Sequence, residues 1–158
     1  MDPNLTIYYA NEGAKLDEAG ATLLGHLTTP SQASQSGPVT SLRFCATSDA
    51  SAVRTRVHQI ALEGRLAQHL VNMDGTLSLF GAIEFRCINL LGEASGDPLF
   101  SVWFDDFGSY GVSNKVGYVS GNPPSSPVAE ERFRNAVAGA LYQAVQAELE
   151  KRILEYGS

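Results

Sequence analysis

The second half of the chain carries apolar runs that follow one another too closely for crossover connections. Leu77 to Leu91 alternates apolar and polar residues after an Asp74-Gly75 turn, and Leu99 to Phe104 is apolar on both faces. Shorter apolar runs follow near Tyr110 and at Val116 to Val119. Parallel neighbours need a connection of a dozen or more residues, so this spacing predicts an antiparallel meander.

One part of the meander supports two interpretations. The run from Leu77 to Leu91 is long for a single strand, and Gly81 is a candidate bend or bulge within it. Phe80, Ile83 and Cys87 would also fit one face of a helix. We expect a strand and leave a partly helical segment as the alternative.

The pattern of the first half predicts two strands and two helices. Leu5 to Tyr9 alternates with period two and predicts a strand, whereas Ala14 to Leu27 repeats its apolar residues at threes and fours and predicts a helix. Val39 to Thr47 alternates again. Ser48 or Asp49 can cap a helix over Ala50 to Val71, whose apolar stripe includes Val53, Val57 and Ile60.

The last third is a proline-rich strap followed by a helix. Residues 120–127 read SGNPPSSP and favour extended backbone. Ser126 can cap a helix that starts near Pro127, and the apolar spacing extends it over 128–156. We therefore expect one domain over 1–158 with a flexible loop at 28–38. Its fold class is α+β, with mixed α/β as the alternative: a two-layer sandwich of β-α-β-α, a meander and a long helix.

Composition excludes some classes of partner. The chain has 158 residues and a formal net charge of −6, which disfavours phosphate backbones and anionic membranes. No apolar run approaches the roughly 18 residues of a membrane span, so we expect a cytoplasmic protein without membrane or nucleic-acid partners. Cys45 and Cys87 lack metal-ligand spacing, and we expect buried free thiols and no cofactor.

A basic stripe is the first candidate site. On a helix over Ala50 to Val71, Arg54, His58, Arg65 and His69 would share one arc opposite the apolar stripe and could bind an anionic ligand. The alternative is a solvated face or a stripe that pairs with the molecule's own acidic residues. His58 and His69 would lie ~16 Å apart, too far to share a metal ion.

Three carboxylates form a second, weaker candidate. Asp105 and Asp106 follow one expected strand and Glu84 lies on its neighbour, so the three could converge on a divalent metal. An ordinary turn accounts equally for Asp-Asp-Phe-Gly, because aspartates in turns bond their own backbone. We expect the turn and no metal.

The C-terminal helix carries two apolar stripes. Phe133, Val137 and Leu141 belong to the first. The second is shifted by about 120° at 100° per residue, and it consists of Val145, Leu149, Ile153 and Tyr156. Against a flat sheet a straight helix cannot bury both, so the second predicts a homodimer interface or a cover by the N-terminal helix or a loop.

No signature of phosphate loops, dinucleotide sites, hydrolases or zinc sites is present. We therefore expect a non-catalytic binding or accessory protein of bacterial or phage type, which recognises another macromolecule, most simply a protein, or assembles into a larger structure. The alternative is a small enzyme or ligand-sensing domain that uses the basic stripe or the Asp105/Asp106 turn.

Overall fold

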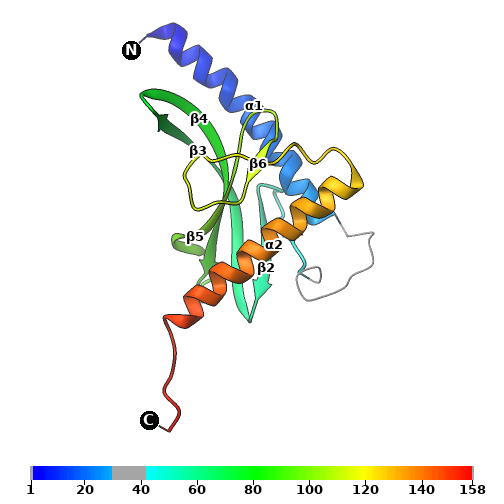
Figure 1. Ribbon diagram of the computed structural model, residues 1–158, viewed down its shortest axis with the longest axis vertical. Helices are drawn as coiled ribbons and strands as arrows, with labels where there is room; N and C mark the ends of the chain where they lie inside the picture. Colours follow the sequence, from blue (N-terminus) through cyan, green and yellow to red (C-terminus); the bar gives the residue numbers. More distant parts are fainter. Residues whose placement is uncertain (1, 30–41, 158) are drawn as a thin grey trace.

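A computed structural model describes residues 2–29 and 42–157, in which two helices cover one face of a curled antiparallel sheet (Figure 1). The six strands are ordered β1-β2-β3-β4-β5-β6, so every strand pairs with its neighbour in the chain. This is an α+β fold. The elements are α1 (Pro3–Thr28), β1 (Cys45–Ala46), β2 (Ala52–Val57), β3 (Ile60–Met73), β4 (Thr76–Ile88), β5 (Ala94–Phe104), β6 (Tyr110–Gly111) and α2 (Pro127–Glu150).

The predicted meander is confirmed, and the long β3–β4 hairpin is its largest part. Asp74 and Gly75 form the hairpin turn with φ of 54° and 88°, as a two-residue hairpin needs. The run after the turn is strand β4, so the helical alternative is wrong. A bulge between Phe85 and Cys87 shifts the pairing with β5. The expected strand at 116–119 does not form, and Tyr110 bridges to Gly121 instead.

The core lies between the two helices and the sheet face toward them, which we call the inner face. Helix residues and alternate strand residues on this face are almost fully buried. Phe85 and Phe104 reach the centre because Gly64 and Gly81 leave room for their rings: an added Cβ would lie 2.5 Å from Phe85 and 2.2 Å from Phe104. The opposite, outer face of the sheet carries no helix (Figure 1).

The predicted strand at Leu5 to Tyr9 is wrong, because these residues belong to α1. Asp2 caps the helix by accepting a hydrogen bond from the Asn4 N–H at 2.9 Å, and Pro3 occupies the first turn. Leu5 and Ile7 are exposed, so their alternation marks no buried sheet face. The helix predicted from Ala14 to Leu27 is confirmed as the second part of α1.

The predicted helix over Ala50 to Val71 is also wrong, since this segment is the β2–β3 hairpin. Val53, Thr55 and Val57 alternate inward with period two, and the Thr55 hydroxyl donates to the Arg43 carbonyl at 2.6 Å. His58 and Gln59 form the turn with positive φ although neither is glycine. The first half therefore runs α-β-β-β, not β-α-β-α.

The predicted strand at Val39 to Thr47 is confirmed only at Cys45–Ala46. Its first residues, like most of the loop expected at 28–38, lie outside the described residues; Thr28 itself ends α1. None of the helices in the described ranges combines the length and apolarity needed to cross a membrane.

Helix α2 begins as predicted and ends early. Ser126 caps it by accepting from the Ala129 N–H at 3.2 Å, but the helix stops at Glu150 rather than 156. The second apolar stripe was predicted to contact a partner chain. Val145 is fully buried and Leu149 packs against the same core, so this prediction is wrong for both residues. The sheet is twisted rather than flat. The core-facing residues of α2 recur every four positions, so their stripe winds around the helix and follows the twist of the sheet. Ile153 and Tyr156 lie beyond the helix and are exposed.

Candidate anion-binding groove

The structure brings three of the four basic-stripe residues to the outer face of the sheet. Arg54 lies on β2, and Arg65 and His69 lie on β3, each at outward positions of the register. His58 is in the β2–β3 turn, where its ring packs edge-on against Tyr142 of α2 at 5.7 Å. The stripe is thus split between two sides of the molecule.

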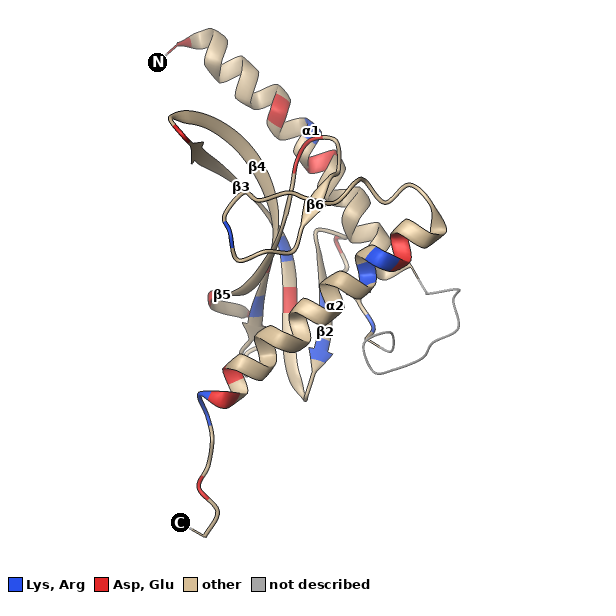
Figure 2. Ribbon diagram, in the orientation of Figure 1, with Lys and Arg blue, Asp and Glu red and all other residues tan. Residues whose placement is uncertain are grey.

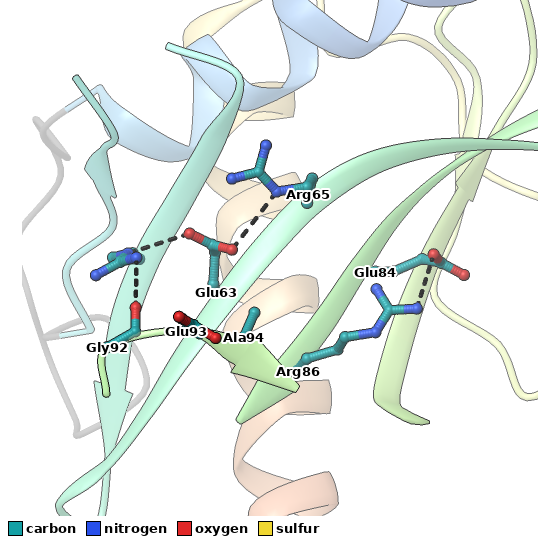
Figure 3. A pocket seen from close by; sticks show the side chains of 8 residues that line it. Glu63, Arg65, Glu84, Arg86, Gly92, Glu93 and Ala94 are labelled. Atoms are coloured by element: carbon teal, nitrogen blue, oxygen red, sulfur yellow. Dashed lines mark hydrogen bonds and ion pairs between the residues drawn. The ribbon is translucent and has the colours of Figure 1, made fainter. Parts of the chain in front are cut away.

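A buried carboxylate joins the two arginines. Glu63 is only 4% exposed, and its oxygens lie 3.1 Å from Arg54 Nε and 3.5 Å from Arg65 Nε (Figure 3). Arg54 also donates to the Gly92 carbonyl, and Arg65 donates to the Ser51 hydroxyl. The arginine side chains themselves are 47% and 51% exposed. Their heads are oriented by hydrogen bonds while one side remains open to solvent.

A second charged cluster lies beside the first. Glu84 on β4 accepts from Arg86 at 3.3 Å, and His69 Nε2 lies 3.1 Å from its other oxygen. Antiparallel register explains the arrangement, because Glu63 pairs with Arg86 and Arg65 pairs with Glu84 across neighbouring strands. The two clusters line a hollow of about 500 Å³ that also includes Glu93. Arginines and glutamates are equal in number there, so the hollow is close to neutral.

An adjoining groove of about 830 Å³ has a different charge. Four arginines line it and no aspartate or glutamate does; Arg54 borders both hollows. We call it the arginine groove, after Arg43, Arg54, Arg56 and Arg152. Arg43 and Arg56 are exposed and form no ion pair with any residue that the structure describes. Arg152 is paired with Glu148 at 3.0 Å.

Apolar side chains border the arginine groove. Ile60, Ile88 and Leu90 line it, and Leu90 and Leu91 are almost wholly exposed. The loop holding these leucines is ordered by Asn89, whose side-chain oxygen accepts from the N–H groups of Leu91 and Glu93. The groove therefore offers cationic and apolar contacts together. Sequence reasoning singled out Arg54 but missed Arg43 and Arg56; the alternation Arg54-Thr55-Arg56 was the available signal.

Both cysteines also line the groove. They are free, as expected, but Cys45 is exposed and Cys87 is only partly buried, so the prediction of buried thiols is wrong for Cys45. The short β1 strand places Cys45 at an outward position opposite Arg54. Burial raises the pKa of the Cys87 thiol, and the nearby Glu148 carboxylate adds to the rise.

The candidate metal residues occupy separate surroundings. Asp105 makes the turn that its sequence suggests, with its side-chain oxygen accepting from the N–H groups of Phe107 and Ser109, both at 3.0 Å. Asp106 borders a cleft against α1, whereas Glu84 is bonded to His69 and Arg86. Across residues 2–29 and 42–157, no three His, Cys, Asp or Glu side chains are grouped so as to hold a metal ion.

Comparison with known proteins adds no relative: no protein-family model, no curated protein and no solved structure matches this chain.

Proposed function

We propose that this chain is a non-catalytic binding protein that recognises an acidic, partly apolar segment of a protein partner through the arginine groove. The observation that carries the proposal is the charge of the groove. Four arginines line it without a carboxylate, in a chain whose net charge is −6. Charge of one sign gathered in a hollow attracts ligands of the other sign and favours their association.

The pairing state of the arginines supports a ligand from outside the chain. Arg43 and Arg56 have no carboxylate partner among the described residues, so binding an acidic segment would break no ion pair at either position. Guanidinium groups bind carboxylates through two parallel hydrogen bonds. Carboxylates placed along a segment can therefore engage these two arginines directly.

The apolar border favours a protein segment over a small anion. Leu90 and Leu91 project from an ordered loop and gain from burial only if the ligand carries apolar side chains of its own. The runner-up function, sensing of a small anion at Arg54 and Arg65, has less support. Both guanidinium groups already bind Glu63, and a small anion would have to compete with that buried carboxylate.

Fluorescence anisotropy with labelled peptides tests the proposal. The probe is a peptide of alternating glutamate and leucine, and the control is the same peptide with lysine in place of glutamate. We expect saturable binding of the glutamate peptide that weakens as salt is added, because salt screens exposed charges. The lysine peptide is expected to stay unbound.

Matched variants locate the binding surface. Arg43→Ala/Arg56→Ala is expected to weaken binding at least tenfold, which corresponds to about 1.4 kcal/mol. Lys15→Ala/Arg132→Ala removes the same net charge from the helices and is expected to leave binding unchanged. Equal losses in both variants would show that net charge and not the groove binds the peptide. Binding of citrate or phosphate without peptide binding would favour the small-anion function.

A further inference from the structure

Most of the large exposed apolar side chains that the structure describes lie at the two opposite ends of the molecule. One group lies on the first turns of α1 and at the tip of the β3–β4 hairpin, and it consists of Leu5, Ile7, Tyr8, Leu70, Met73 and Leu77. A second group lies beside the arginine groove and in the segment after α2, and it consists of Leu90, Leu91, Ile153, Leu154 and Tyr156. We call these the hairpin end and the groove end. Clustered exposed apolar residues commonly mark interaction sites.

The hairpin end is acidic. Its own residues include two carboxylates, Asp2 before the first turn of α1 and Asp74 in the hairpin turn, and no lysine or arginine. Farther along α1, Glu12 is paired with Lys15 at 3.3 Å. Gln68 holds α1 against β3 by donating to the Gly13 carbonyl and to Asp17. The turns of α1 that precede this contact project past the core with Leu5, Ile7 and Tyr8 exposed. In Figure 2 acidic residues mark this upper part of α1 and the hairpin tip.

The groove end carries the opposite charge on its binding surface. The four groove arginines lie there, next to the exposed leucines of the β4–β5 loop. Glu148 near the end of α2 forms ion pairs with Lys151 and Arg152. The two ends thus match each other in both respects: each offers apolar side chains, and their charges are opposite.

One copy of the chain cannot bring its own two ends together. The Asp74-Gly75 turn and the His58-Gln59 turn lie at opposite ends of β3, whose 14 residues span about 45 Å at 3.3 Å per residue. The termini lie at these same opposite ends (Figure 1). A contact between the hairpin end and the arginine groove therefore requires two molecules.

We infer that the acidic segment bound by the arginine groove is the hairpin end of a second copy of this chain. The inference rests on the proposed function and names its partner. The contact joins different surfaces of the two copies, so a pair keeps one free end of each kind: the groove end of one copy and the hairpin end of the other. Such a head-to-tail contact continues into a chain of molecules, or closes into a ring if the rotation between neighbours allows it.

Sedimentation velocity of two variants, alone and mixed, tests the inference. Arg43→Glu/Arg56→Glu removes the groove surface, and Ile7→Lys/Tyr8→Lys removes the hairpin-end surface. The wild type is expected to grow beyond its monomer mass of 16.9 kDa as concentration rises. Each variant alone should stay monomeric, and their equimolar mixture should form one-to-one pairs and nothing larger, because only one intact contact remains. Ala21→Lys adds a lysine to an exposed position of α1 and should assemble like the wild type.

Either of two other outcomes overturns the inference. A wild type that remains monomeric at all concentrations shows that no such contact forms. If one variant still assembles by itself, the contact is symmetric and joins two copies through the end that this variant leaves unchanged. Circular dichroism and melting temperature verify that every variant folds. The peptide assay separates this inference from the proposed function: a monomeric wild type that still binds the glutamate peptide refutes only the second copy as partner, whereas a monomer without peptide binding refutes both.

Discussion

Arg54 and Glu63 face each other across the β2–β3 pair, with Nε and Oε1 3.1 Å apart, and the same buried carboxylate also lies 3.5 Å from Arg65 Nε. A buried carboxylate depends on its cations more than half-exposed arginines depend on it, because only the carboxylate is cut off from water. The contribution of the two arginines to stability should therefore be strongly non-additive.

We predict that Arg54→Ala alone lowers the free energy of unfolding by less than about 1 kcal/mol, since Arg65 still compensates Glu63. Arg54→Ala/Arg65→Ala leaves the buried carboxylate without either cation and should cost about 2–4 kcal/mol. Urea unfolding measures both. A triple variant that also carries Glu63→Gln should recover part of the loss, and equal small losses in all three would contradict a buried ion cluster.

Two glycines should respond in opposite directions to alanine. At Gly81 the new Cβ would lie 2.2 Å from the Phe104 ring, so Gly81→Ala should lower the free energy of unfolding by about 2–3 kcal/mol through overpacking. Gly139 lies inside α2 with nothing within 4 Å of an added Cβ, so Gly139→Ala should raise it by up to about 1 kcal/mol. Thermal unfolding of the pair is the measurement, and a stable Gly81→Ala would disprove the close approach of Phe104.

Hydrogen bonds from Ser51 and Thr47 lower the pKa of Asp49 from 3.8 to about 2. The depressed pKa belongs to the folded state, so the stabilisation is present above about pH 4 and is lost as pH falls toward 2. Carbon-detected NMR titration should place the Asp49 midpoint near 2. Ser51→Ala removes the largest cause and should move the midpoint upward, and an unchanged midpoint would exclude the bonded geometry.

Leu149 and Ile153 were predicted to share one surface, but the structure separates them. Leu149→Glu should cost about 1–3 kcal/mol of unfolding free energy because this side chain packs against the core. Ile153→Glu should change it by less than about 0.5 kcal/mol, since the residue is 70% exposed. Chemical denaturation in dilute solution, where copies stay apart, compares the two. Similar losses would mean that the segment after α2 packs against the fold.

The amino-acid sequence by itself determined the elements whose signals are local. The Asp74-Gly75 turn, the alternation from Leu77 onward and the Ser126-Pro127 start of α2 each fix their structure within a few residues, and each is found as predicted. The aspartate cap and the first-turn proline of α1 are equally local signals. The alternation of Leu5, Ile7 and Tyr9 predicted a strand there instead.

Tertiary packing decided the β2–β3 hairpin and, through it, the candidate site. The apolar residues of 53–64 fit a helical and an extended period equally well. The His58-Gln59 turn has positive φ at both residues, but neither is a glycine, so the sequence gives no turn signal there. The extended form prevails because it buries Val53, Val57 and Leu62 against Phe85 and the helices. The His58-Gln59 turn sets the β2–β3 register and so places Arg54 opposite Glu63, and the separate β1–β2 pairing places Cys45 opposite Arg54. A helix over the same residues would bring neither pair together, because cross-strand neighbours exist only once the strands pair.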